Sequence, residues 1–166
     1  MVFEDETGFT LHPRLGRGWA RRGQRLRVPT TSQHHTRLNC FGWVAPMLKR
    51  WRVLRTARGN QAGFVTCLRQ VMRQLRWYTV WLYVDGAPWH RGPEVEAFLH
   101  AHPRLHVEYL PRYQPGLNVQ ERIWRQVRYE ATTNQWFTDL GQTWQAVHRT
   151  ITSWTPAKLG RLCNIT

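Results

Sequence analysis

Three of the ten carboxylate side chains in this chain of 166 residues stand where they could take part in chemistry. Asp5 lies at the end of a short extended run, residues 2–6, and Asp85 directly follows the apolar run TVWLYV. Glu121 lies one turn into a helix-like run that follows a proline-rich corner. If the first two runs form parallel neighbouring strands, Asp5 and Asp85 lie side by side at the carboxyl edge of a sheet, where sites in such sheets form. Glu121 would then close the group from its helix.

A group of three carboxylates predicts a metal site. Such groups repel one another unless divalent cations lie between them, and hard oxygen ligands suit magnesium or manganese. Two ions about 3.5–4 Å apart can activate a water or a 3′-hydroxyl and stabilise the leaving oxygen of a displacement at phosphorus. We therefore expect Asp5, Asp85 and Glu121 to bind two Mg²⁺ or Mn²⁺ ions and to act in phosphoryl transfer.

The same acids also have a structural interpretation. Asn118 and Glu121 have nearly the spacing of a capping box, and Glu121 can pair with Arg125 one turn later. Asp85 followed by Gly86 is typical of a turn. On the residues alone, both interpretations stay open.

The charge balance predicts a polyanionic partner. The chain carries 24 Lys and Arg residues against 10 Asp and Glu residues, a net charge of +14. Nucleic acid is the usual partner of so basic a chain, and an anionic membrane surface is the competing one. Only Lys49 and Lys158 are lysines, and guanidinium groups match phosphate oxygens in pairs. The candidate DNA contacts, each of which could also be a solvated basic residue, are Arg14, Arg17, Arg21, Arg22, Arg25, Arg27, Arg125 and Arg128.

Other classes of site and location fit poorly. Cys40, Cys67 and Cys163 are far apart, which argues against a disulfide framework and a thiolate zinc site. A zinc site built from the histidines at 100, 102 and 106 has poor ligand spacing. No run of about 18 apolar residues and no export signal occurs, so we expect no membrane partner and a cytoplasmic location.

The elements that must position these residues predict an α/β fold. One domain over residues 1–166 is expected from the length. Residues 10–36 are rich in Gly, Pro and Arg and predict a long basic loop. Besides the first run, strands are expected at 38–45, 51–55, 79–84 and 105–110, with the run at 79–84 covered on both faces. Helices are expected within 60–76 and 92–102, around Glu121 and over 140–154. Together they indicate a mixed sheet flanked by helices.

Five motifs in order resemble a known family. They are EDETGF, GRGWARRGQ, LNCFGWVA, VDGAPWHR and LPRYQPGLNVQERIW. Over essentially the whole chain they are similar to the catalytic domain of mariner-like DDE transposases, in the branch of bacterial insertion sequences. The resemblance implies a ribonuclease-H-like fold with a five-stranded mixed sheet. It also implies magnesium-dependent DNA cleavage and strand transfer by Asp5, Asp85 and Glu121. His90 and Asn118 match family positions near the active site, where they would contact DNA, orient Asp85 or cap the helix.

The resemblance also implies partners. The DNA would be transposon ends and target DNA, in the bacterial nucleoid, and residues 10–36 would reach toward a partner subunit in a homodimer. The chain starts at the first strand, before which the family has helix-turn-helix recognition domains, so we expect either the second half of a split reading frame, with those domains on a separately encoded N-terminal segment, or a fragment. The alternative is a catalytically decayed or repurposed remnant that acts as a basic DNA-binding domain. Gly86, where the family usually has Asn, favours the remnant, whereas the intact triad favours the enzyme.

Overall fold

The computed structural model describes residues 1–33, 35–112 and 114–164. Its contacts divide the chain into two compact units. The sheet unit comprises Met1–Thr7, Asn39–Trp124 and Thr155–Thr166, and the arm unit comprises Gly8–Leu38 and Arg125–Trp154. The residues of the candidate triad all fall in the sheet unit.

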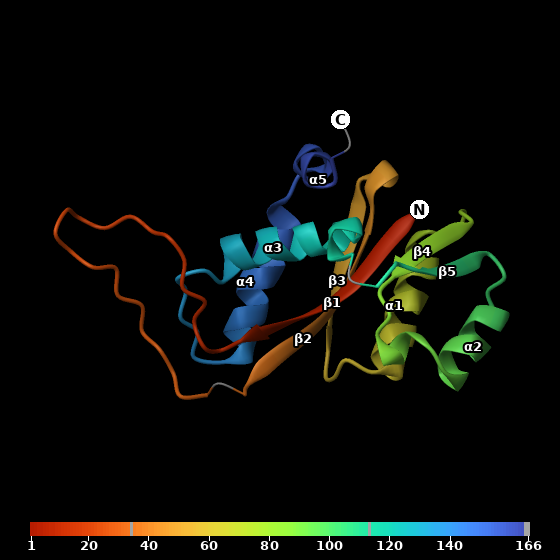
Figure 1. Ribbon diagram of the computed structural model, residues 1–166, viewed down its shortest axis with the longest axis horizontal. Helices are drawn as coiled ribbons and strands as arrows, with labels where there is room; N and C mark the ends of the chain where they lie inside the picture. Colours follow the sequence, from red (N-terminus) through yellow and green to blue (C-terminus); the bar gives the residue numbers. More distant parts are fainter. Residues whose placement is uncertain (34, 113, 165–166) are drawn as a thin grey trace. The chain divides into compact units, whose positions relative to one another are not determined.

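Five strands form one sheet in the order β3-β2-β1-β4-β5. Strand β2 pairs antiparallel with β3, whereas β4 pairs parallel with both β1 and β5 (Figure 1). The predicted mixed five-stranded sheet is therefore confirmed. The strands are β1 Val2–Thr10, β2 Arg37–Ala45, β3 Arg50–Thr56, β4 Val80–Val84 and β5 Leu105–Tyr109.

Two expectations about the strands were wrong. Strand β1 continues to Thr10, so Asp5 lies within it and not at its end. The acidic run does not stop the strand because Glu4 is buried and Glu6 is largely buried, and both have partners inside the fold. Strand β4 is not covered on both faces: Val80, Leu82 and Val84 are buried, but Trp81 on the other face is 45% exposed. An apolar run does not distinguish a face that is buried from one that carries exposed aromatic rings.

One face of the sheet is covered by α1 (Gln61–Gln74). Its residues Phe64, Leu68 and Val71 are fully buried among the inward residues of β4, as the helical spacing predicts. The Asn60 side chain caps this helix by accepting a hydrogen bond from the Gly63 amide. Helix α1 packs against α2 (Pro93–His100) and the short helix η2 (Pro88–His90), which follows Asp85. This packing fixes the segment that carries the second acid of the candidate triad.

The first turns of α3 (Val119–Ala131) lie against β2 because Gly42 has no side chain. A Cβ atom at Gly42 would lie 2.5 Å from Trp124 Cζ2 and 2.6 Å from Gln120 Nε2. Trp124 and Gln120 are both buried. The close approach sets the position of Glu121, which lies between them in the same helix.

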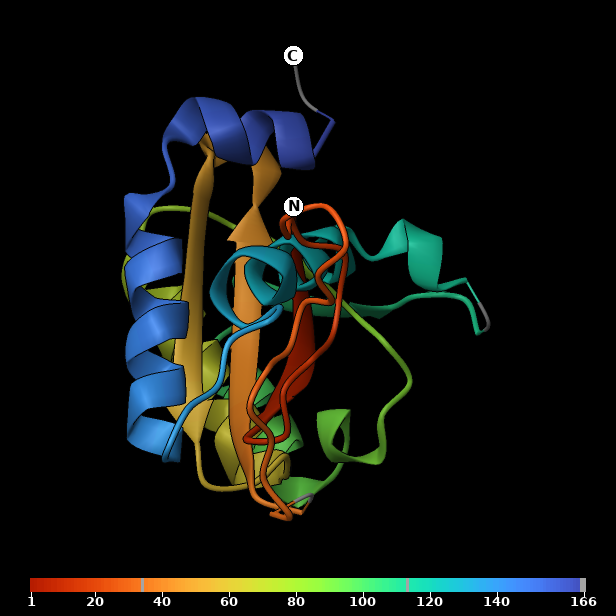
Figure 2. The ribbon, with the colours of Figure 1, turned by 90° about the vertical axis from the view of Figure 1, so that its left-hand side faces the viewer.

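A short helix, α5 (Pro156–Leu162), was not expected from the sequence. Thr155 caps it by accepting a hydrogen bond from the Lys158 amide, and Pro156 occupies its first position. It packs against η1 (Pro46–Leu48), the short helix that joins β2 to β3 (Figure 2). The helix is too short to show a clear apolar period, which is why the sequence did not predict it.

The arm unit contains the predicted long basic loop. Within the described part of residues 11–36 there is no helix or strand, only an isolated bridge between Arg14 and Thr133. The loop runs as two extended limbs (Figure 1) and reverses at Arg21, whose carbonyl accepts a hydrogen bond from the Gln24 amide. Gly23 has φ = 82° in this turn, a conformation that favours glycine. The unit also holds α4 (Leu140–Ser153), which Asp139 caps.

Candidate metal centre

Asp5 and Asp85 lie beside each other at the junction of β1 and β4. The parallel register pairs Val2 with Leu82 and Phe3 with Tyr83. Continued by two residues, this register sets Asp5 next to Asp85. Side-chain oxygens of Asp5, Glu6 and Asp85 lie within 4.8 Å of one another, a spacing at which they could share a metal ion. The sequence predicted the proximity of the two aspartates but missed Glu6.

Glu121 faces the same site from α3. It lines a cavity of about 510 Å³ together with Asp85, Asn118 and Arg112. Burial and the neighbouring carboxylates, with Glu6 first and then Asp85 and Glu121, raise the pKa of Asp5 to about 8. The negative charges of the site are therefore close enough to oppose one another's ionisation.

The buried His90 side chain contacts Asp85. Its ring is fully buried, and its Nδ1 lies 3.1 Å from Asp85 Oδ1 and 3.1 Å from the Asp85 carbonyl oxygen. The Ala87 amide donates a second hydrogen bond, of 2.9 Å, to Asp85 Oδ1. The hydrogen bond from His90 lowers the pKa of Asp85 and outweighs burial, which acts in the opposite direction. Asp85 is thus kept ionised and oriented.

The other ring nitrogen of His90 faces two glutamates that the sequence did not single out. Its Nε2 lies 2.9 Å from Glu6 Oε1 and 3.3 Å from Glu4 Oε2, and the Trp89 indole donates to the same oxygen of Glu6. Burial lowers the pKa of His90, but its contacts with Asp85, Glu4 and Glu6 outweigh burial and raise that pKa to about 12. These contacts favour the imidazolium form of His90, which links the acids of β1 to Asp85.

Glu4 is fully buried, and burial raises its pKa to about 8. Glu4 and Glu6 stand two residues apart in β1, an alternation that brings both carboxylates to the same ring nitrogen of His90, and Glu6 also comes within 4.8 Å of Asp5 and Asp85. This alternation of acids in β1, together with a histidine five residues after Asp85, is the sequence pattern from which the contacts of His90 with these acids could have been predicted.

Asn118 connects the start of α3 to β1. Its side-chain Nδ2 donates a hydrogen bond to the Glu4 carbonyl oxygen at 2.9 Å. Its Oδ1 accepts one from the backbone amide of Gln120 at 3.0 Å. The side chain is buried and caps the helix, as one interpretation of the sequence expected. Since both bonds are internal, Asn118 sets the position of Glu121 relative to β1.

The eight arginines predicted to contact DNA all lie in the arm unit. Seven of them are exposed and Arg128 is half-buried. Arg112, which lines the carboxylate cavity in the sheet unit, was missed. Arg112 belongs to the LPRYQPGLN stretch. Its position three residues after the end of β5 is the sequence feature that could have placed it near the carboxylates.

The donor set fits a hard divalent cation. Asp5 and Asp85 offer oxygen ligands at one spot, and Glu121 lines the same cavity as Asp85. Of the described residues, a second group, Glu4, Glu6 and His90, is also close enough for an ion, and there the Nε2 atom of His90 contacts both glutamates. The histidines at 100, 102 and 106 form no such group within the described chain. His102 stacks on Phe98 and His106 stacks on Trp81.

Cys40, Cys67 and Cys163 are buried free thiols. None of the helices that the structure describes is long and apolar enough to cross a bilayer.

A family model described as DDE superfamily endonuclease matches residues 1–143. The chain belongs to the DDE superfamily endonucleases. This DDE-family chain is also similar to the insertion element IS630 uncharacterized 39 kDa protein of Shigella sonnei. The two are 26% identical over 162 residues, which cover 97% of this chain and 47% of that protein. The chain thus spans about half the length of the curated relative it matches.

Solved structures of Mos1 transposase have the same fold. The Mos1 strand transfer complex matches with a TM-score of 0.72 and 16% identity, over 98% of this chain and 50% of that one. The catalytic domain of Mos1 mariner transposase matches with a TM-score of 0.66 and 15% identity, over 98% and 74% of the two chains. At this identity the likeness concerns the fold, and it confirms the ribonuclease-H-like class predicted from the sequence.

Proposed function

We propose that residues 1–166 form the catalytic domain of an insertion-element transposase. It cleaves DNA and joins strands by phosphoryl transfer, and Asp5, Asp85 and Glu121 bind two Mg²⁺ or Mn²⁺ ions. The observation that carries the proposal is the meeting of Asp5 and Asp85, oxygens within 4.8 Å, beside a cavity that Glu121 also lines. Family membership supports it, as do the fold matches to Mos1 mariner paired-end complexes with Mn and with Mg.

The chemistry divides between the cations and the side chains around them. Bound divalent cations supply Lewis acidity for the attacking water or 3′-hydroxyl and for the leaving oxygen. Asp5, Asp85 and Glu121 provide the ligands, and their negative charge balances that of the cations. Protonated His90 keeps Asp85 ionised and fixes its rotamer. Arg112, at the cavity wall, offers a guanidinium to the phosphate that is being attacked.

The arm unit supplies the charge for binding DNA. Its exposed arginines neutralise phosphates of transposon ends and target DNA. The loop of residues 10–36 reaches a second subunit in a homodimer assembled on DNA. The protein acts at the nucleoid.

One observation favours the alternative function, a remnant that binds DNA without cutting it. Gly86 lines the carboxylate cavity, and a Cβ atom placed on it would meet nothing within 4 Å. A larger polar residue would fit there and could support Asp85. Because Gly86 has no side chain, it gives Asp85 no such support.

Cleavage of a supercoiled plasmid that carries the element's ends tests the proposal. Nicking is expected to be at least about tenfold faster with Mg²⁺ or Mn²⁺ than with EDTA, since the cations supply the Lewis acid. Binding of the plasmid without metal-dependent nicking would instead support the remnant.

The role of His90 gives a separate prediction. The variant His90→Gln is expected to raise the Mg²⁺ concentration needed for half-maximal cleavage by about 10- to 100-fold, the usual effect of removing a residue that orients a metal ligand. The matched control is His102→Gln, because His102 is also a packed ring, stacked 4.0 Å from Phe98. A lower maximal rate with an unchanged Mg²⁺ requirement would mean that His90 serves only the fold.

A further inference from the structure

Strand β5 is an edge of the sheet, and on its outer side no other strand of the described chain pairs with it (Figure 1). Its bonds to β4 define which of its backbone groups face outward. The Val80 amide donates to the Arg104 carbonyl at 2.8 Å, and the Leu110 amide donates to the Val84 carbonyl at 2.8 Å. Because successive residues of a strand direct their backbone groups to opposite sides, the even-numbered residues of β5 bond to β4.

The odd-numbered residues of β5, which are Leu105, Val107 and Tyr109, therefore direct their N–H and C=O groups away from the sheet. The Leu105 amide is already used, since it donates to the His102 carbonyl at 2.9 Å. The Leu105 carbonyl and the backbone groups of Val107 and Tyr109 stay open to a partner from outside the sheet. An edge of this kind is a template for pairing with another strand.

The opposite edge of the sheet is protected against such pairing by charge. Strand β3 carries three exposed arginines: Arg50, Arg52 and Arg55. Strand β5, with the sequence LHVEY, has no lysine, arginine or proline. The preceding Arg104 does not guard it, because the Arg104 guanidinium donates to the carbonyls of Arg76 and Tyr78. Strand β5 is thus the edge that is open to a partner.

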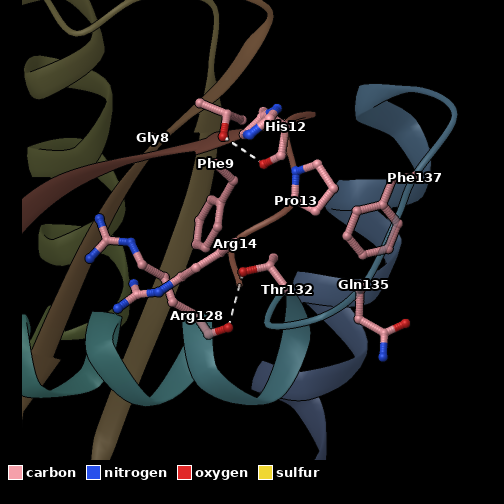
Figure 3. A pocket seen from close by; sticks show the side chains of 10 residues that line it. Gly8, Phe9, His12, Pro13, Arg14, Arg128, Thr132, Gln135 and Phe137 are labelled. Carbon is pink, nitrogen blue, oxygen red and sulfur yellow. Dashed lines mark hydrogen bonds between the residues drawn. The ribbon is translucent and has the colours of Figure 1, made fainter. Parts of the chain in front are cut away.

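Elsewhere the chain satisfies such backbone groups with its own side chains. At the end of α3 the Thr132 hydroxyl donates to the Arg128 carbonyl at 3.0 Å (Figure 3). The Asn134 side chain accepts from the Gly16 amide at 2.9 Å and donates to the Gly16 carbonyl at 3.1 Å. No side chain among the described residues bonds to the outward groups of Val107 in this way.

The side chains of β5 are complementary to a second copy of the same strand. When two copies pair antiparallel about Val107, His106 of each copy lies opposite Glu108 of the other. The two Val107 residues then exchange their outward N–H and C=O groups. His106 and Glu108 form the pairs without backbone hydrogen bonds, whose side chains approach most closely. An imidazole N–H can donate to the carboxylate that faces it, so both pairs are favourable.

The side chains beside this edge are held in place by the fold. On one face the His106 ring stacks on Trp81, with 4.5 Å between the ring centres and 23° between the planes. On the other face the Tyr109 hydroxyl donates to the His90 carbonyl at 3.0 Å, and the Arg91 guanidinium carbon lies 4.4 Å from the centre of the Tyr109 ring. Trp81 and Tyr109 are both exposed, so a second copy would remove apolar surface from water.

We propose that β5 pairs antiparallel with β5 of a second copy of this chain and joins the two sheets across a two-fold axis. This contact does not involve the loop of residues 10–36, and it requires neither DNA nor metal, so it does not depend on the proposed function. A pairing of five residues a side is smaller than a standard interface, so a Kd on the order of 1–100 µM is expected.

Sedimentation equilibrium of the full chain, without DNA and in EDTA, tests the proposal. The variant Glu108→Arg is expected to weaken the dimer at least about tenfold, because it sets an arginine opposite His106. The variant His106→Glu should weaken it by a similar factor, because two glutamates then face each other. The double variant restores opposite charges across the axis and is expected to dimerise within about threefold of the wild type.

The matched control is Glu96→Arg, which makes the same change in charge at an exposed position of α2 and should dimerise like the wild type. Hydrogen exchange locates the contact. The Val107 and Tyr109 amides should exchange more slowly at high than at low protein concentration in the wild type, and at equal rates in Glu108→Arg.

A wild-type chain that stays monomeric up to about 1 mM would overturn the inference. A dimer that Glu108→Arg leaves intact would also overturn it and would place the contact elsewhere, such as in the loop of residues 10–36. A double variant that is folded by circular dichroism but monomeric would exclude the pairing of His106 with Glu108. Loss of the dimer in Glu96→Arg would mean that overall charge, and not β5, controls association.

Discussion

The variant Asp85→Asn is expected to lower the rate of metal-dependent DNA cleavage by about a thousandfold or more. Asn has nearly the shape of Asp and keeps an oxygen that can accept from the Ala87 amide, so the local fold should persist. What it loses is the charge that binds the cation. Lewis-acid stabilisation is worth several kcal/mol, and each 1.36 kcal/mol corresponds to about tenfold in rate.

Initial nicking rates at saturating Mn²⁺ and at limiting Mg²⁺ measure the loss. The matched control is Glu94→Gln, an exposed carboxylate in the first turn of α2, which should leave the rate unchanged. An Asp85→Asn protein that is folded and cuts at the wild-type rate would exclude the proposed metal centre, because that centre requires the negative charge of Asp85.

The variant Asp5→Asn is expected to stabilise the metal-free protein at alkaline pH while it abolishes cleavage. The pKa of Asp5 is raised from 3.8 to about 8, chiefly by burial and then by Glu6. Between these values the folded chain holds a proton that the unfolded chain has released, so stability falls as the pH rises from about 4 to about 8. Above pH 8 the folded wild type must carry a partly buried, repelled charge, which asparagine lacks.

Urea unfolding in EDTA measures this effect. At about pH 9 the variant should exceed the wild type by roughly 2 kcal/mol in the free energy of unfolding, whereas below pH 4 the two should agree. Mn²⁺ should stabilise the wild type at pH 8 and largely fail to stabilise the variant. Equal stabilities across the whole pH range would show that the Asp5 charge is well solvated and would weaken the argument for a preorganised metal site. Glu94→Gln again serves as the control, with no expected gain.

The results expected for the two variants imply that the negative charges of the site disfavour folding when no metal is bound. Such a cost in stability is common where function requires like charges to be held together. His90 offsets part of it, since its positive charge faces Glu4 and Glu6 on one side and Asp85 on the other.

The sequence by itself determined most of the helices and strands, though not α5, and it determined the identity of the triad candidates. Helix α1 followed from the spacing of its apolar residues, α2 from Pro93 and the acids in its first turn, and the loop at 10–36 from its glycine, proline and arginine content. These features are local, because period, capping and turn chemistry depend on residues a few positions apart. Asp5, Asp85 and Glu121 were found because each follows or begins a predicted element, and because the motifs around them resemble a family.

Only the tertiary structure decided what surrounds those acids. His90 meets Glu6 across 84 positions of the chain, Asn118 reaches the Glu4 carbonyl across 114, and Asn134 holds Gly16 across 118. The true extent of β1, the exposure of Trp81 and the place of Arg112 likewise depend on which elements pack together. A charge, a burial or a hydrogen bond of this kind arises from the pairing of distant segments, and the residues near each partner in the sequence carry no record of that pairing.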